Sequence, residues 1–343
     1  MTTYPPPQLG ERFVLGFKGP RVPEWLRAFE ARFGLGGVIL FDYDVGAGRY
    51  GNNVTSPRQV RALCAELADL PSGPLVFVDQ EGGKVRRFKE ALGFCPLPSA
   101  ADFARLPPER RLELATASYR ELRELGIHFN LAPVVDLNFN PENPDIGAHG
   151  RSYSDQPSII REIVSGLDQA ARKAGLGLCL KHYPGLGAAR TNSHDELTDL
   201  TGSISDVQLK LFWDLAAQII GQAVLVSHGL ARQWDAERPV SVSPNSLRIL
   251  RERVPQALLI SDDMQMQGLR KMMTLQAACG SALEAGLDLL LIGNNLLDEQ
   301  EAMAGLVAGL GNVVTGSPDS AGLHEQALNR IRARKQHFSA RPV

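Results

Sequence analysis

The sequence predicts an α/β fold, a single (β/α)8 barrel of the TIM type. Eight short apolar runs alternate with segments of helical periodicity, and this alternation is typical of a parallel sheet covered by helices. No glycine-rich GxGxxG turn follows the first run, although an open dinucleotide-binding sheet would require one. A chain of 343 residues suits one barrel with insertions, so we expect a single domain over 1–343.

The expected strands are the runs rich in Val, Ile and Leu. Each run is apolar throughout, as in strands of a parallel sheet that are buried on both faces. In chain order the expected strands cover residues 14–17, 37–41, 75–78, 128–135, 177–181, 223–227, 257–261 and 288–292.

The expected helices fill the intervals between these runs. In chain order they cover residues 24–33, 57–70, 108–125, 156–174, 205–220, 244–254 and 272–285, with two more, 298–310 and 319–336, after the last strand. Residues 1–10 are polar and proline-rich and are expected to be a flexible terminus, while 319–343 form a C-terminal helix and tail. No repeat or linker divides the chain.

Composition and charge narrow the class of protein. The formal net charge of −2 comes without any run of like charges, so neither nucleic acid nor an anionic membrane is expected as a partner. The four cysteines lie far apart, which predicts reduced thiols. The N-terminus lacks the basic start and apolar stretch of a signal peptide, and no apolar run reaches the ~20 residues of a membrane span. We expect a cytoplasmic monomer.

Polar side chains follow most of the expected strands at the point where each strand ends. They are Asp79-Gln80-Glu81, Asp136, Lys181-His182, His228, Asp262-Asp263 and Asn294-Asn295. Active sites of barrels lie at the carboxyl ends of the strands, so we expect these side chains to converge on one polar pocket. Lys181 directly follows a buried run and therefore needs a partner or a ligand rich in hydrogen-bond acceptors, such as a sugar.

Two other kinds of site are disfavoured. A barrel metal site usually begins with His-x-His on the first strand, whereas this strand ends Gly16-Phe17-Lys18-Gly19, so no metal or other cofactor is expected. A phosphate site would lie after the seventh and eighth strands, where Asp262 and Asp263 would repel it.

Four motifs together resemble one known family. They are Val-Asp-Gln-Glu-Gly-Gly-Lys-Val at 78–85, Lys-His-Tyr-Pro-Gly at 181–185, Asn-Ser-His at 192–194 and Ser-Asp-Asp-Met at 261–264. Over about residues 13–310 the chain resembles glycoside hydrolase family 3, specifically the single-domain bacterial β-N-acetylglucosaminidases (β-N-acetylhexosaminidases) of cell-wall recycling. The resemblance implies a barrel that removes terminal β-linked N-acetylglucosamine from peptidoglycan-derived carbohydrate, with retention of configuration through a covalent glycosyl-enzyme intermediate.

The resemblance also implies roles for individual residues. Asp262 matches the nucleophile, and His194, on the loop after the fifth strand, matches the acid/base that this branch of the family uses. The carboxylate that pairs with this His lies two residues earlier, at the position of Asn192. The sugar-binding positions of the family correspond to Asp79, Arg87, Arg151, Lys181 and His182.

Simpler structural roles remain open for two of these positions. A strand-end aspartate often caps the following helix, and Asp263 is a better candidate for that role than Asp262. Arg87 lies among other basic residues and could be a solvated surface charge.

The acid/base loop departs from the family pattern at two positions. The family reads Pro-Gly-His-Gly and then Asp-Ser-His, whereas this chain has Leu186 in the first motif and Asn192 in the second. An amide lacks the charge with which a carboxylate raises the pKa of a neighbouring imidazole, so His194 is expected to be a weaker acid. Asp195 and Asp199 lie close enough in sequence to substitute for the missing carboxylate.

Three functions therefore stay open. The first is an active β-N-acetylglucosaminidase, which the retained Asp262 favours. The second is a family member with another glycone or with phosphorolytic activity. The third is a catalytically impaired protein that binds amino sugars.

Overall fold

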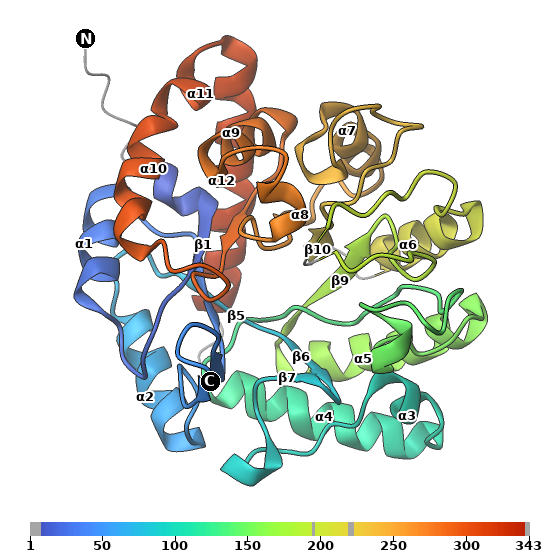
Figure 1. The fold of residues 1–343 in the computed structure, drawn as a ribbon. Coiled ribbons are helices and arrows are strands. Elements are labelled where there is room, and N and C mark those ends of the chain that lie inside the picture. Colours follow the sequence, from blue (N-terminus) through green and yellow to red (C-terminus); the bar gives the residue numbers. More distant parts are fainter. Residues whose placement is uncertain (1–7, 194–195, 219–222, 340–343) are drawn as a thin grey trace.

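The barrel predicted from the sequence is confirmed by the computed structural model, which describes residues 8–193, 196–218 and 223–339. Eight parallel strands form one sheet in the order β11-β10-β9-β8-β5-β2-β1-β12. The two ends of this sheet meet where Ile260 bridges Leu289 and where the amide of Ser261 donates to the carbonyl of Leu289 (3.0 Å). Figure 1 shows the helices arranged around the strands.

Each expected strand is present. The barrel strands are β1 (Phe13–Gly16), β2 (Gly37–Leu40), β5 (Leu75–Val78), β8 (Phe129–Asn130), β9 (Gly177–Tyr183), β10 (Ala223–Val226), β11 (Leu258–Ser261) and β12 (Leu290–Ile292). Two hairpins follow β2 and β5, namely β3 (Tyr43–Asp44) with β4 (Arg49–Tyr50), and β6 (Gln80–Gly82) with β7 (Val85–Arg86). The fourth barrel strand is shorter than the predicted 128–135 because Pro133 has no amide hydrogen to donate to a ladder.

The expected helices are present as well. They are α1 (Glu24–Phe33), α2 (Pro57–Ala68), α4 (Pro108–Glu124), α5 (Pro157–Ala174), α6 (Asp206–Gln218), α7 (Pro244–Arg253), α9 (Leu275–Ala285), α10 (Met303–Gly309) and α12 (Pro318–Ser339). Three short helices were not predicted: α3 (Ala100–Ala104), α8 (Gln267–Arg270) and α11 (Gly311–Thr315). Helix α9 begins later than expected because the Thr274 hydroxyl accepts from the amide of Ala277 (3.2 Å) and caps it. No helix among the described residues is long and apolar enough to cross a membrane.

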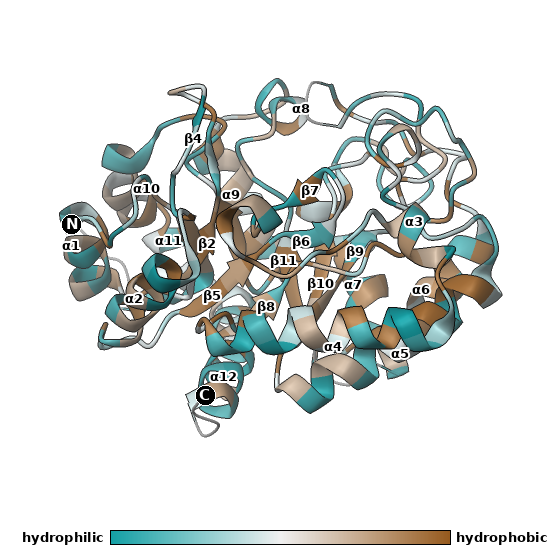
Figure 2. Ribbon diagram, turned by 90° about the horizontal axis from the view of Figure 1, so that it is seen from below, coloured by the Kyte–Doolittle hydropathy of each residue, from teal (hydrophilic) through white to brown (hydrophobic). Residues whose placement is uncertain are grey.

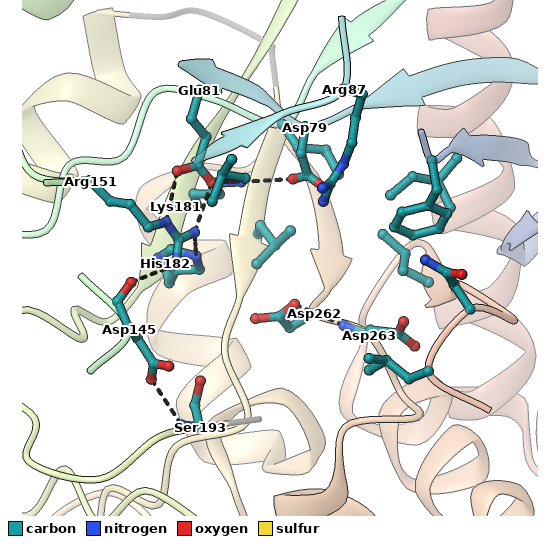
Figure 3. A pocket seen from close by; sticks show the side chains of 18 of the residues that line it. Asp79, Glu81, Arg87, Asp145, Arg151, Lys181, His182, Ser193, Asp262 and Asp263 are labelled. Carbon is teal, nitrogen blue, oxygen red and sulfur yellow. Dashed lines mark hydrogen bonds and ion pairs between the residues drawn. The ribbon is translucent and has the colours of Figure 1, made fainter. Parts of the chain in front are cut away.

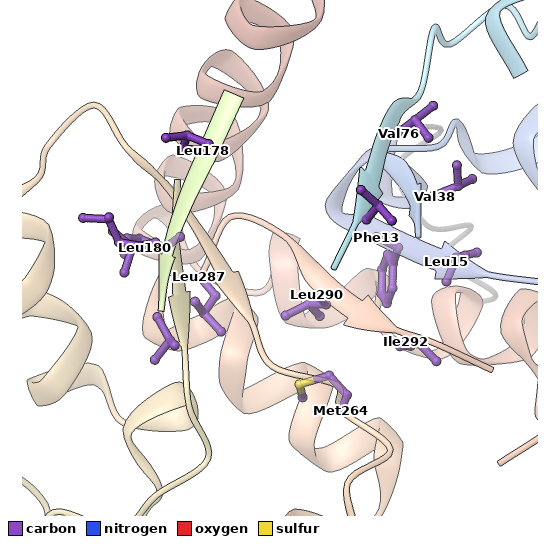
Figure 4. Packing of buried hydrophobic residues seen from close by; sticks show 14 of the residues in the cluster. Phe13, Leu15, Val38, Val76, Leu178, Leu180, Met264, Leu287, Leu290 and Ile292 are labelled. Atoms are coloured by element: carbon purple, nitrogen blue, oxygen red, sulfur yellow. The ribbon is translucent and has the colours of Figure 1, made fainter. Parts of the chain in front are cut away.

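Alternation along the strands divides the core into two clusters. Successive side chains of a strand point to opposite faces, so every second residue of a barrel strand faces outward. The outward cluster packs under the helices and includes Phe13, Leu15, Val38, Val76, Leu178, Leu180 and Leu290 (Figure 4). The inward cluster fills the barrel and includes Val14, Ile39, Phe77, Phe129, Cys179, Leu225, Ile260 and Leu291.

The amino ends of the strands are covered by the C-terminal helix and by residues near the N-terminus. Ile331 and Phe338 of α12 belong to the inward cluster and close this end of the barrel. Leu9 and Gly10, predicted to be flexible, are instead buried, because the apolar Leu9 packs into the core. Figure 2 shows hydrophobic strands, with α12 at one end of the barrel and α8, β4 and β7 at the other. The carboxyl ends of the strands are thus left open for a site.

Candidate active site

Three charged residues point into the open end of the barrel because side chains alternate between the two faces of each strand. Asp79, Lys181 and Asp262 each follow an inward-facing apolar residue by two positions, so each continues the inward face of its strand. The three apolar residues are Phe77, Cys179 and Ile260. Asp79, Lys181 and Asp262 line one pocket with a volume of about 260 Å³ (Figure 3). The convergence predicted from the strand ends is confirmed for these residues.

Lys181 is the centre of a buried ionic network. Its Nζ lies 2.8 Å from Oδ1 of Asp79 and 2.5 Å from Oε1 of Glu81, and its side chain is only 3% exposed. Burial alone would raise the pKa of Asp79, but the cations of Lys181 and Arg87 lower it below its usual range. The partner that a buried lysine requires is therefore a pair of carboxylates.

Arg151 is fixed by the same network. It binds Glu81 in a bidentate manner, with Nε 2.8 Å from Oε2 and Nη2 2.7 Å from Oε1. Its Nη1 donates to the backbone carbonyl of Asp145 (2.9 Å). The guanidinium is thereby held at the wall of the pocket by both of its edges.

His182 lines the pocket with a defined tautomer. Arg151 Nη2 lies 3.2 Å from His182 Nε2, and because a guanidinium only donates, Nε2 is the acceptor. The proton of a neutral ring then resides on Nδ1, which donates to Oδ2 of Asp136 (2.7 Å). Asp136 itself does not line the pocket; its other oxygen accepts from the amide of Leu186 (2.7 Å), so it supports His182 from behind.

Asp262 and Asp263 have different environments. Asp262 Oδ1 accepts from the amide of Asp263 (2.9 Å). Asp263 Oδ1 accepts from the amides of Gln265 (3.0 Å) and Gly293 (3.3 Å). Burial, together with the charge of Asp262, raises the pKa of Asp263 to about 7 against these hydrogen bonds. Asp263 therefore ties the ends of two strands together; it does not cap α8, whose N-cap residue is Met266.

Arg87 is a pocket residue rather than a solvated surface charge. It follows the β6–β7 hairpin, its side chain is 22% exposed, and Nη2 lies 3.2 Å from Oδ2 of Asp79. The guanidinium also stands over the ring of Phe41, with 5.4 Å between its central carbon and the ring centroid. The hairpin thus places the guanidinium of Arg87 beside Asp79 as a second cation.

The loop after β9 carries the predicted acid/base residues. Its Ser193 lines the pocket, and the amide of Ser193 donates to Oδ2 of Asp145 (2.8 Å). Asn192 is half-buried, and its carbonyl accepts from the amide of Glu196 (3.0 Å). His194 and Asp195 lie outside the described residues. Asp199 is on the surface, where Oδ2 lies 3.4 Å from Nε of Arg232.

Some strand-end residues do not reach the pocket, and the pocket residue Asp145 was missed. His228 is buried behind the site, where it contacts the hydroxyl of Ser241 (2.7 Å), and Asn294 donates to the carbonyl of Gly16 (3.0 Å). Glu81 was expected in the pocket as part of the strand-end run Asp79-Gln80-Glu81 but was given no role of its own, and Asp145 was not predicted as a site residue. The role of Glu81 could have been found from the partner that a buried Lys181 needs, whereas Asp145 lies within an irregular loop with no such signal.

Glu81→Gln is expected to reduce the acid sensitivity of the fold. Burial alone would raise the pKa of Glu81, but Arg151 and Lys181 lower it from 4.5 to about 2. Because the folded pKa lies below the unfolded one, the ionised carboxylate stabilises the fold fully above about pH 4.5, and this contribution is lost as the pH falls toward 2. The variant should be less stable at neutral pH and lose less stability on acidification, as measured by urea unfolding at several pH values.

Glu252→Gln is the matched control, because this carboxylate is 62% exposed and pairs with Arg248 on the same helix. The control should follow the wild-type pH dependence. Equal pH dependence in the Glu81→Gln variant and the wild type would contradict the prediction.

Comparison with known proteins identifies the family of the chain. Residues 24–326 match the family described as glycosyl hydrolase family 3 N terminal domain. A protein of Methylococcus capsulatus named beta-hexosaminidase is 33% identical over 310 residues, which cover 88% of this chain and 87% of that protein. A beta-hexosaminidase of Methylobacillus flagellatus is 30% identical over 287 residues, covering 79% of this chain and 77% of the relative.

Solved structures show the same architecture. A family 3 beta-N-acetylglucosaminidase from Paenibacillus superposes with a TM-score of 0.85 at 27% identity, over 97% of this chain; the chain spans 62% of that longer protein. A beta-N-acetylhexosaminidase from Beutenbergia cavernae superposes with a TM-score of 0.81 at 25% identity, over 96% of this chain and 98% of that one. The resemblance inferred from the motifs is confirmed: the chain is a glycoside hydrolase that belongs to glycosyl hydrolase family 3.

Proposed function

We propose that this enzyme removes terminal β-linked N-acetylglucosamine with retention of configuration, through a covalent intermediate on Asp262. The observation that carries the proposal is the placement of Asp262 in the same pocket as the network of Asp79, Lys181 and Arg151. A nucleophilic carboxylate thus faces a site rich in fixed donors and acceptors. The names of the two relatives, both beta-hexosaminidases, support the choice of N-acetylglucosamine as the sugar that is removed.

Recognition of the sugar follows from the hydrogen-bonding capacity of the network. Asp79 accepts from hydroxyl groups, while Lys181, Arg151 and Arg87 donate to hydroxyl and carbonyl oxygens. His182 completes the set at the wall next to Arg151. Because the charged groups are already paired, they are held in place before the sugar arrives.

The apolar part of the pocket suits the remaining surface of the sugar. Phe41, Val45 and Leu296, from the loops after β2 and β12, line the pocket beside the charged groups. Aliphatic and aromatic surface of this kind accommodates the C–H face of a pyranose and the methyl group of an N-acetyl substituent. The volume of 260 Å³ is below the about 300–1,000 Å³ of drug-sized ligand pockets, which favours a single terminal sugar unit.

The reaction has two steps. In the first, an Asp262 oxygen bonds to the anomeric carbon as the glycosidic bond breaks, and the acid gives its proton to the leaving oxygen. In the second, a water oxygen replaces Asp262 at the anomeric carbon and gives a proton back to the same group, now the base. We assign this acid/base role to His194, as the motif implies.

The proposed natural substrates are peptidoglycan fragments that carry a terminal N-acetylglucosamine. The resemblance of the four motifs to the cell-wall-recycling branch supports this choice. A disaccharide of N-acetylglucosamine and anhydro-N-acetylmuramic acid therefore represents the substrate better than an aryl glycoside, whose activated leaving group needs little help from an acid.

The wild-type enzyme is expected to hydrolyse both this disaccharide and nitrophenyl β-N-acetylglucosaminide. Its kcat/KM for nitrophenyl β-glucoside should be at least about 10²-fold lower, because the contacts with the N-acetyl group are lost. Proton NMR of early product should show the β-anomer. Binding of the sugar without cleavage would identify an amino-sugar-binding protein instead, and a sugar 1-phosphate formed in phosphate buffer would identify a phosphorylase.

A further inference from the structure

The proposed removal of a single terminal sugar, on which this inference rests, divides the substrate between the inside and the outside of the pocket. A volume of about 260 Å³ accommodates one sugar unit, so the leaving group must lie at the opening. The side chains that reach the opening therefore decide which leaving groups bind well.

Two pocket-lining side chains reach the opening, and both are aliphatic. Val45 is 46% exposed and Leu296 is 40% exposed, whereas the other lining residues that the structure describes are buried or half-buried. Exposed apolar surface beside a pocket is typical of a place where a ligand binds. We call Val45 and Leu296 the apolar lip.

The apolar lip is built from two segments that lie far apart in sequence. Val45 is in the turn between β3 and β4, a hairpin at the open end of the barrel (Figure 2), and Leu296 follows β12. Asn295 joins the two segments, because its Oδ1 accepts from the amide of Val45 (3.1 Å) and its Nδ2 donates to the carbonyl of Tyr43 (3.1 Å). The lip is thus held in place before a ligand arrives.

Ion pairs connect the same two segments to the end of β1. Nζ of Lys18 lies 3.5 Å from Oδ1 of Asp44 and 3.1 Å from Oδ2 of Asp298. Asp44 directly precedes Val45, and Asp298 comes two residues after Leu296. The charged residues next to the lip in sequence are therefore paired with one another, and the lip itself presents aliphatic surface to the leaving group.

We propose that the apolar lip is a leaving-group subsite, which binds aglycones with aliphatic surface in preference to aglycones covered with hydroxyl groups. The buried parts of Val45 and Leu296 face the sugar, and their exposed parts contact the first carbon atoms of the aglycone. This contact removes apolar surface of both partners from water. Because the contact is the same in the ground state and in the transition state, it lowers KM more than it changes kcat.

Binding of methyl and butyl 1-thio-β-N-acetylglucosaminide, whose sulfur linkage resists cleavage, tests the subsite separately from catalysis. Full burial of one methylene group is worth about fourfold in affinity. The three added methylene groups are only partly buried on an open lip, so the wild type should bind the butyl compound about 10-fold more tightly than the methyl compound. Isothermal titration calorimetry measures both dissociation constants.

The double variant Val45→Thr/Leu296→Asn replaces aliphatic surface of the lip by a hydroxyl and an amide group. The ratio of the two dissociation constants should fall to about 2-fold or less. Leu297→Asn is the matched control, because Leu297 is a neighbouring leucine that is 43% exposed and does not line the pocket. This control should keep the ratio of the wild type.

Hydrolysis of the corresponding oxygen glycosides gives a second readout. The two alcohols are similar leaving groups, so the wild type should show a lower KM for the butyl glycoside and a similar kcat for both. For N,N′-diacetylchitobiose, whose leaving sugar is covered with hydroxyl groups, kcat/KM of the double variant should stay within about 2-fold of the wild type.

Equal affinity of the wild type for the methyl and butyl thioglycosides would overturn the subsite. An equal loss of the double variant on the methyl and butyl glycosides would also overturn it, and would place the lip against the terminal sugar instead. Failure of the proposed function is distinct, because the wild type would then hydrolyse none of these glycosides, while the ratio of the thioglycoside dissociation constants still tests the lip.

Discussion

Asp262→Asn is expected to lower kcat by about 10⁴-fold to 10⁶-fold on every N-acetylglucosaminide, the range seen when a covalent nucleophile is removed. The amide oxygen still accepts from the amide of Asp263, as Oδ1 does in the wild type (2.9 Å), so the local backbone should remain in place. Only the negative charge that attacks the anomeric carbon is lost. Steady-state kinetics, with thermal unfolding as a check on folding, measure the effect.

Asp262→Ala offers a second readout that depends on chemistry rather than on loss of activity. The smaller side chain makes room for azide, which should replace the missing nucleophile and release an α-glycosyl azide from an activated substrate. Rescue with this stereochemistry identifies the face of the sugar on which Asp262 lies. Activity of Asp262→Asn within about 10-fold of the wild type would exclude Asp262 as the nucleophile, because removal of a covalent nucleophile costs far more.

Lys181→Met is expected to lower the free energy of unfolding by about 3–5 kcal/mol, the range for removing one partner of a buried ion pair. Lys181 contacts both Asp79 (2.8 Å) and Glu81 (2.5 Å), and its side chain is 3% exposed, so the substitution leaves two buried carboxylates short of a cation. Sugar affinity should fall as well, because the ammonium group lines the pocket. Urea unfolding at neutral pH measures the stability.

Acidification should reduce this destabilisation. Without Lys181, a carboxylate of the pair takes up a proton more readily, so the difference from the wild type shrinks as the pH falls. Lys210→Met is the matched control, since Lys210 is 71% exposed and pairs with Asp214 one helical turn away. Its effect should be below about 1 kcal/mol, as for surface pairs. A similarly small effect of Lys181→Met would contradict a structural role of the network.

Much of the fold could be read from apolar patterns alone. Eight runs of apolar residues predicted eight barrel strands, and the helices between them were located within a few residues. The deviations have local causes: Pro133 shortens the fourth strand, and the side chain of Thr274 moves the start of α9. Burial of Leu9 depended on contacts with distant parts of the core, which no local pattern reveals.

The residues of the site also fall into a group that the sequence predicts and a group that it does not. Residues at or near the carboxyl ends of strands, such as Asp79, Lys181 and Asp262, were predictable because strand alternation and the common direction of parallel strands decide where they point. On the irregular loops, Arg151 was assigned only through the resemblance and Asp145 was not predicted, because hydrogen bonds between segments far apart in sequence decide the positions of such residues. Asp145, 48 residues before its partner Ser193, meets the acid/base loop only because the loops after β8 and β9 pack together.

The amino-acid sequence thus contains the barrel, the family motifs and the departure at Asn192, since each depends on residue type and short-range spacing. Only the tertiary structure pairs Lys181 with Glu81 and brings Asp145 to the loop that lacks a carboxylate. The physical reason is that strand direction and apolar periodicity are local properties of the chain. The pairing of buried charges instead depends on which loops meet in three dimensions, because a buried charge without a partner is costly.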